Sequence, residues 1–364
     1  MRLPNSLRLC GVLIFTLVNS LACSNTYADS RDSNSVEARL VDAAEHGKLD
    51  DMGRLLAAGA NVNGRYYVST PLLSAIYKKQ KSSVRLLLDA GADPNLPDYS
   101  GTPLAGAITS GSDPEVVELL LSHGADPNIE YGRKRERRTP LVALANSNPY
   151  TALHNEKFIR DMKRIGIPIK LGSKANQERI AKMLIGAGAK FDLAENDCDS
   201  PLNAAIVHNN VMLADLFLDK GANPNMIAGA DCAEPGKTPL ELALVHYFQY
   251  NDPTIMTLLM EHGANTNYRV DKEFIPGPPF FQDRAWNGIT PLLFAVESDF
   301  VKPVQILLSH GADPCLPRTD GTLPIEIATE HHYKAIMSLL RKSMSGLHCE
   351  ASVKNPDTEN ELHK

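Results

Sequence analysis

The chain has 364 residues, of which 43% are hydrophobic and 6% aromatic, and its formal net charge at pH 7 is −6. A large apolar fraction with few rings predicts a core built from Leu, Ala, Val and Ile. The acidic balance makes the chain a poor candidate for binding the phosphate backbone of nucleic acid, so no nucleic-acid partner is expected.

Residues 1–28 have the layout of a secretory signal peptide. Arg2 and Arg8 give a positive start, and small residues up to Ala28 follow an apolar run, Leu9–Val18, that is short for a membrane span. We therefore expect an exported, periplasmic protein in which residues 29–36 form a short linker.

Cys23 offers an alternative to free export. The letters "SLAC" partly resemble a bacterial lipoprotein box, although Ser20 stands where that motif favours Leu. In this alternative a lipid on Cys23 anchors the protein in the outer membrane, and membrane contact is expected only in that case.

Two phrases recur along the rest of the chain. One is "LLLDAGADPN" at 86–95, which returns as "LLLSHGADPN" at 119–128 and "LLMEHGANTN" at 258–267. The other is "STPLLSAI", which starts at Ser69 and returns as "ITPLLFAV" at Ile289. Self-similarity at a fixed period is typical of repeat architectures, in which neighbouring units stack to bury their apolar faces.

Each phrase has a physical reading. Thr or Ser before Pro starts a helix well, because the hydroxyl caps free N–H groups and Pro suits the first helical position. The Leu pairs form the buried stripe of a second helix. The Gly suits the left-handed residue that ends this helix, and Pro and Asn then turn the chain.

The pairing of T-P-L-x-x-A with L-L-x-x-G-A-D-P-N resembles the ankyrin repeat over roughly residues 36–345. The resemblance implies an all-α repeat solenoid in which two antiparallel helices alternate with β-hairpin fingers along a concave groove that binds a protein partner. We expect a repeat domain over 37–345 and a C-terminal tail over 346–364. It would hold about eight units, at about 38–63, 69–95, 101–128, 138–192, 199–225, 237–267, 289–315 and 321–342.

The spacing of the repeats is broken at several fingers, the segments between the Gly that ends one repeat and the Thr or Ser that starts the next. The regular Gly-to-Thr interval is 11 residues (59→70, 91→102), but it reaches 15 at 124→139, 17 at 221→238 and 27 at 263→290. Insertions in a solenoid form loops that often mark the binding face.

The basic finger, Ile129–Arg138, reads "IEYGRKRERR". Its functional interpretation is a docking patch for an acidic protein surface, and its structural alternative is a solvated hairpin tip. The candidate partner-binding residues are Arg133, Lys134, Arg135, Arg137 and Arg138.

The long finger, Tyr268–Ile289, carries five aromatic residues beside Arg269 and Arg284. Aromatic and Arg side chains are enriched in interface hot spots, but the same rings could roof the base of their own loop. The candidate partner-binding residues are Phe274, Phe280, Phe281, Arg284 and Trp286.

A further insertion, about 146–176, separates the two helices of the fourth unit. Phe158, Ile159, Met162 and Ile165 have helical spacing with basic residues between them. This pattern predicts an extra amphipathic helix that packs back on the solenoid.

Four cysteines remain after removal of the signal peptide, and an even number in an exported chain favours disulfides. The ankyrin-like architecture places adjacent units side by side, which implies the pairs Cys198–Cys232 and Cys315–Cys349. Four free thiols are the alternative.

We find no catalytic or metal-binding motif in the sequence, so no enzyme activity and no cofactor are expected. The sequence predicts a non-catalytic exported protein that binds and regulates or neutralises a periplasmic partner, as an inhibitor, immunity factor or chaperone. A lipid-anchored structural scaffold of the cell envelope is the alternative.

Overall fold

The computed structural model describes residues 35–98, 100–111, 113–132, 138–147, 173–191, 200–227, 237–269, 289–347 and 349. These ranges contain sixteen α-helices, which confirm the predicted all-helical repeat architecture. The chain divides into two compact units, Met1–Asp93 and Pro94–Lys364.

The first unit holds the first two repeats. Its helices are α2 (Val36–Glu45), α3 (Leu49–Ala57), α4 (Pro71–Tyr77) and α5 (Lys81–Asp89). Helix α2 packs against α3 and α4, and α4 packs against α5. The finger between the two repeats is closed by a bridge between Tyr66 and Ser69.

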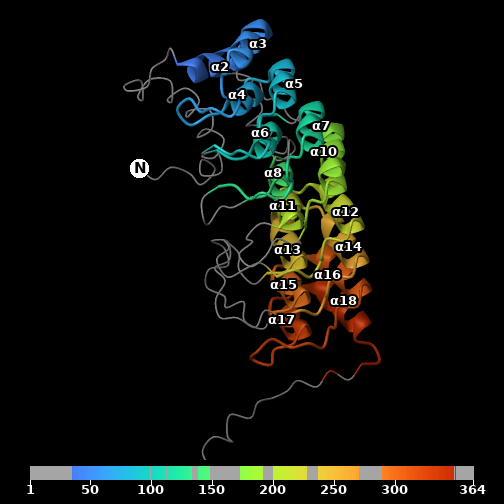
Figure 1. Ribbon diagram of the computed structural model, residues 1–364. Helices are drawn as coiled ribbons and strands as arrows, with labels where there is room; N and C mark the ends of the chain where they lie inside the picture. Colours follow the sequence, from blue (N-terminus) through green and yellow to red (C-terminus); the bar gives the residue numbers. More distant parts are fainter. Residues whose placement is uncertain are drawn as a thin grey trace, which may run out of the picture. The chain divides into compact units, whose positions relative to one another are not determined.

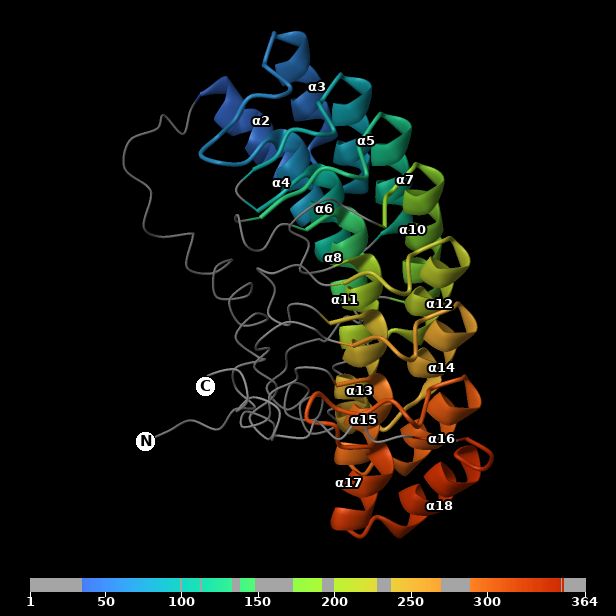
Figure 2. The same cartoon turned by 90° about the horizontal axis from the view of Figure 1, so that it is seen from below.

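The second unit stacks six repeats in two rows of helices (Figures 1 and 2). The first helix of each repeat packs against the first helix of the next, and the second helices form the other row. The first row consists of α6 (Pro103–Thr109), α8 (Pro140–Asn146), α11 (Pro201–Val207), α13 (Pro239–Tyr250), α15 (Pro291–Glu297) and α17 (Pro324–Glu330). The second row consists of α7 (Pro114–Ser122), α10 (Lys174–Gly186), α12 (Val211–Asp219), α14 (Thr254–Glu261), α16 (Val301–Ser309) and α18 (Lys334–Ser343).

The helix starts follow the predicted chemistry. The side-chain oxygen of the Thr or Ser that begins each T-P-L or S-P-L phrase accepts the backbone N–H three residues on, which is the expected N-cap. Leu323 has no such oxygen, and there the Glu326 carboxylate accepts the Leu323 N–H at 2.8 Å instead. The glycines that follow the second helices are left-handed as predicted, with φ of 87° at Gly91 and 84° at Gly311.

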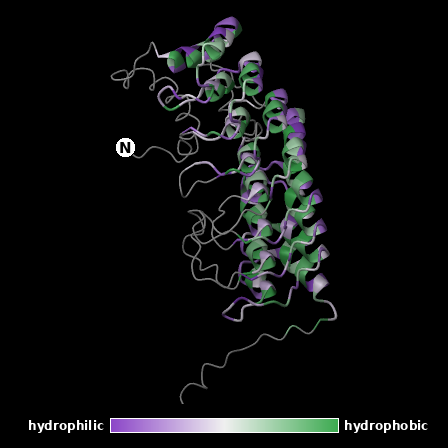
Figure 3. Ribbon diagram, viewed as in Figure 1, coloured by the Kyte–Doolittle hydropathy of each residue, from purple (hydrophilic) through white to green (hydrophobic). Residues whose placement is uncertain are grey.

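The core lies between the two rows, where both faces of the first helices are covered. In α11, for example, every residue from Pro201 to Ile206 is buried, whereas α12 buries one stripe of Leu213, Ala214, Phe217 and Leu218. Apolar residues therefore concentrate on the helices and hydrophilic ones on the connecting segments (Figure 3). No single repeat could bury its apolar surface alone.

In the second unit, an asparagine at the start of several fingers bonds the turn that follows the next second helix. Asn225 donates its side-chain N–H to the Gly263 carbonyl at 3.0 Å and accepts the Asn265 N–H at 2.7 Å. Within the second unit, Asn95 makes the same two bonds to Gly124 and Asp126, and Asn267 makes them to Gly311 and Asp313. We call each such pair of bonds a rung.

The rungs continue past the insertion in the fourth repeat. Asn128 bonds the Gly188 carbonyl at 3.0 Å and the Lys190 N–H at 2.9 Å, 60 and 62 residues further along the chain. The side-chain amide of the buried Gln177 donates to the Ser147 carbonyl at 2.9 Å, and this bond links the two ends of the insertion. The repeat thus closes as if the insertion were absent. The predicted helix at 158–165 lies outside the described residues.

None of the described helices is both long and apolar enough to cross a membrane.

The rungs predict a measurable part of the stability. Asn225→Ala removes two bonds between repeats, so the free energy of unfolding should fall by about 1–2 kcal/mol, a modest loss because the rung is exposed to water. Urea unfolding of this variant and of Lys220→Ala, an exposed change in the same repeat, measures the difference. Equal stability of the two variants would show that the rungs only accompany helix stacking.

Candidate functional site

The structure describes the bases of the elongated fingers. Residues 133–137, 192–199, 228–236 and 270–288 lie outside the described residues. The sequence-predicted residues in this group are Arg133, Lys134, Arg135, Arg137, Cys198, Cys232, Phe274, Phe280, Phe281, Arg284 and Trp286, and Cys23 is likewise outside.

The basic finger is closed at its base by a two-residue bridge. The backbone N–H of Tyr131 donates to Arg138 O at 3.0 Å, and the N–H of Arg138 returns the bond at 2.9 Å. The Tyr131 ring covers Gly101, where an added Cβ would lie 2.8 Å from the ring, so the glycine leaves room for it. Burial raises the pKa of Tyr131 to about 12. The structure thus places the half-buried Arg138 at the hairpin base.

The long finger is braced by its own first residues. The Arg269 guanidinium donates to the Pro317 carbonyl at 2.7 Å, which connects this finger to the following one. At the other end Ile289 is buried and Thr290 caps α15. Both ends of the long finger are therefore held at fixed points of the stack.

The finger after α16 is fixed by an ion-pair network. Arg318 contacts the buried Glu297 side chain and Asp320, each at 2.7 Å. Hydrogen bonds from Thr322, together with Arg318, lower the pKa of Asp320 to about 2. The Pro317 carbonyl, which accepts the hydrogen bond from Arg269, thus belongs to a hairpin that these ion pairs hold in place.

The third elongated finger, between Gly221 and Thr238, ends in a buried polar group. Lys237 is 1% exposed and Glu241 is 6% exposed. Glu241 accepts the Thr238 N–H at 2.8 Å, and the Thr238 hydroxyl oxygen accepts the Glu241 N–H at 3.3 Å, which forms a capping box; the Thr238 hydroxyl also donates to Glu241 at 3.1 Å. Burial raises the pKa of Glu241 to about 7, although these bonds and Lys237 oppose the shift.

Sequence reasoning missed the extension of α13. This helix has 12 residues, whereas the other T-P-L and S-P-L helices have seven. Its extra turn packs the Tyr247 ring edge to face against Phe300, with centroids 5.1 Å apart, and leaves Phe248 66% exposed. The signal was present, because Thr238 to Gly263 takes 25 residues and Thr70 to Gly91 takes 21.

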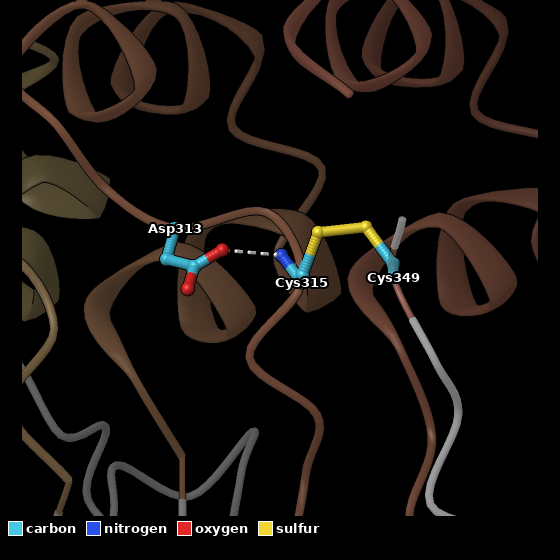
Figure 4. Close-up of a disulfide and its surroundings, with 3 residues drawn as sticks. All are labelled: Asp313, Cys315 and Cys349. Carbon is cyan, nitrogen blue, oxygen red and sulfur yellow. Dashed lines mark hydrogen bonds between the residues drawn. A yellow bond between two sulfur atoms is a disulfide. The ribbon is translucent and has the colours of Figure 1, made fainter. Parts of the chain in front are cut away.

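Cys315 and Cys349 form a disulfide, as predicted, with Cα atoms 5.0 Å apart (Figure 4). The second predicted pair falls outside the described residues and stays a prediction.

In the described part of the chain, three side chains of the kinds that bind metal ions lie close together. Ligand atoms of Asp215, Asp219 and His262 lie within 4.8 Å of one another on the second-helix row. Both carboxylates are exposed to water, and we assign no metal to the group.

Comparison with known families fits this geometry. A model for three ankyrin repeats matches residues 40–131, and a model for a single ankyrin repeat matches residues 287–318. Both coincide with capped helix pairs of regular spacing. The chain is an ankyrin repeat protein. Ankyrin repeats are generally scaffolds for protein–protein interaction and are typically non-catalytic.

The curated relatives share the repeat. The ankyrin repeat protein nuc-2 of Neurospora crassa is 26% identical over 210 residues, 55% of this chain and 17% of that protein. Human B-cell lymphoma 3 protein is 25% identical over 167 residues, 46% of this chain and 32% of that protein. The chain thus spans less than a third of either relative. The crystal structure of the human ASB11 ankyrin repeat domain shares 21% identity and covers 76% of this chain and 98% of its own, with a TM-score of 0.47.

The two family models leave out the middle of the chain, residues 132–286. That stretch holds the fourth-repeat insertion, most of the basic finger, the finger at 221–238 and nearly all of the long finger. The rungs of Asn128 and Asn225 nevertheless run through it. The helical stack therefore keeps the ankyrin pattern while the connections depart from it.

The raised pKa of Glu241 predicts a pH dependence. Because its pKa is ordinarily 4.5 and rises to about 7 in the fold, its contribution to stability is full below pH 4.5 and is lost as the pH rises through 7. The loss should be roughly 3 kcal/mol. Glu241→Gln keeps an acceptor for Thr238 but cannot titrate. Its free energy of unfolding should therefore rise relative to that of the wild type as the pH increases from 4.5 to 8. A difference between the two proteins that is constant over this range would contradict the assignment.

Proposed function

We propose that this ankyrin repeat protein is an exported, non-catalytic binder that regulates or neutralises a partner protein through its elongated fingers. The observation that carries the proposal is that the helical stack keeps the ankyrin pattern, whereas the elongated fingers depart from it and are held at their bases. The described finger bases are fixed by the Tyr131–Arg138 bridge, the Arg269–Pro317 bond and the Thr238–Glu241 capping box. Fixed bases lower the entropic cost of ordering a loop when it binds.

The composition of the fingers favours a protein as the partner. The long finger brings Trp286 and Phe281 next to Arg284 in the sequence, and these are the residue types that dominate interface hot spots. The basic residues within 133–137 of the basic finger would suit an acidic partner surface. The fingers and the groove beside them would together form the recognition face.

The proposal of export rests on two features. Residues 1–28 have the composition of a signal peptide, and the Cys315–Cys349 disulfide suits an oxidising compartment such as the periplasm. An inhibitor, an immunity factor and an assembly chaperone are the roles that a non-catalytic binder would have there.

A lipid-anchored envelope scaffold is the second candidate, favoured by the letters "SLAC" around Cys23. Fractionation of cells that carry the wild type and Cys23→Ser separates the two. A shift from membrane to soluble fraction on substitution supports the anchor, and soluble behaviour of both proteins removes it.

The recognition role of the long finger can be tested at Trp286. A photo-crosslinking amino acid at position 286 should capture one partner protein in the source cells, while the same amino acid at Lys182, exposed on α10, should not. With that partner purified, Trp286→Ala should weaken binding by about 2 kcal/mol or more and change the unfolding midpoint little.

The competing account, in which the rings roof their own loop, predicts the reverse. Lost stability with affinity retained in Trp286→Ala and Phe281→Ala would make the finger architectural, and the binding face would then be sought at Arg133–Arg138.

A further inference from the structure

The last junction of the stack has a cysteine at the position where five earlier fingers have an asparagine, which are Asn63, Asn95, Asn128, Asn225 and Asn267. Cys315 follows Gly311 by four residues, as Asn267 follows Gly263. The Asp313 carboxylate accepts the Cys315 N–H at 2.8 Å, and Asn265 accepts the Asn267 N–H in the same way at 2.9 Å (Figure 4). Cys315 is therefore held in the rung position by the same local bond.

The disulfide reaches the segment that a rung would reach. Asn267 crosses to Gly311 and Asp313, the glycine after the next second helix and the residue two beyond it. Cys315 crosses to Cys349, three residues after Gly346. Gly346 is the third residue after α18 and has a φ of 90°, while Gly311 is the second residue after α16 and has a φ of 84°, so both helices are followed by a left-handed glycine. The S–S bond thus stands in place of the two hydrogen bonds.

A reduced cysteine could not replace the rung. A thiol is a weak donor and a weak acceptor, and it is too short to serve a carbonyl and an N–H together as an asparagine amide does. In the reduced protein the last junction would therefore have neither the covalent bond nor the hydrogen bonds.

The helix beyond this junction buries fewer side chains than an interior helix does. Helix α18 buries Ile336 and Leu340, whereas α14 in the interior of the stack buries four residues. Helix α18 packs against α16 and α17, and its outer surface is solvated. The end of α18 depends more on its tether than an interior helix does on its rung.

The hairpin on the other side of the disulfide has anchors of its own. Pro317 receives Arg269, and Arg318 is paired with Glu297 and Asp320. These contacts do not involve Cys349. Loss of the disulfide would therefore release the α18 side and leave the 316–322 hairpin in place.

We propose that the Cys315–Cys349 disulfide is a redox latch that substitutes for the asparagine rung and holds the end of the eighth repeat. A dithiol reductant opens it: one thiolate attacks a cystine sulfur to form a mixed disulfide, and the second thiol displaces that bond. Two electrons and two protons pass to Cys315 and Cys349, and the reductant leaves as its own disulfide. Opening loosens the C-terminal half of α18 and residues 344–347.

Hydrogen exchange on the full chain, with and without dithiothreitol, tests the latch. Reduction should speed exchange in the second half of α18 and in 344–347 by at least about tenfold, and leave α15, α16 and the 316–322 hairpin unchanged. Alkylation and mass spectrometry confirm that both cysteines are reduced. Unchanged exchange at full reduction, or faster exchange throughout the stack, would overturn the proposal.

Two matched double variants isolate the rung. Cys315→Asn with Cys349→Ser should regain a non-covalent rung and show intermediate protection that dithiothreitol does not alter. Cys315→Ser with Cys349→Ser should exchange as fast as the reduced wild type. Equal protection of these two variants would overturn the equivalence of position 315 with the asparagine positions. Sensitivity to reductant that persists in the double Ser variant would assign the effect to other cysteines and overturn the latch.

Discussion

The structure depends on one constraint, which is that a helix pair of this size cannot bury its apolar face without a neighbour. In first helices such as α8 and α11 both faces are covered, so these segments are almost continuously apolar. The chain meets the constraint by stacking, and the asparagine rungs set the register of one repeat on the next. The hydrophobic burial supplies most of the free energy, and the exposed rungs supply alignment.

The same constraint explains where the chain tolerates change. The stack needs only the helix pairs and the first residues of each finger, so the connections can lengthen at a small entropic cost that grows slowly with their length. The insertion after Ser147 shows this directly, because Gln177 and the rung of Asn128 close the repeat around it. The proposed function assigns recognition to the connections, whereas stability lies in the two rows of helices.

The sequence alone predicts the parts of this structure that are local. Thr70 and Thr290 cap their helices as expected, and the left-handed Gly91 and Gly311 end theirs, because each needs only its own neighbours in the chain. The Cys315–Cys349 pair is not local, and it was predicted from the side-by-side placement of adjacent repeats that the ankyrin resemblance implies.

The contacts that escaped prediction are those between residues far apart in the chain. Arg269 reaches Pro317 across 48 residues, and Gln177 reaches Ser147 across 30, and no periodicity encodes either bond. The extra turn of α13 left a trace in the spacing from Thr238 to Gly263, but a spacing alone does not say whether a helix or a loop has grown. The basic and aromatic finger residues have a chemical character in the sequence, and their role remains a proposal.

The most direct test of the separation between stack and fingers is to replace residues 270–288 with a short connection that copies the regular Gly91–Thr102 finger. Thermal unfolding followed by circular dichroism, together with binding to the crosslinked partner, gives both quantities. The account predicts an unchanged unfolding midpoint, an unchanged helical signal and the loss of partner binding. A collapse of the midpoint with binding retained would contradict it.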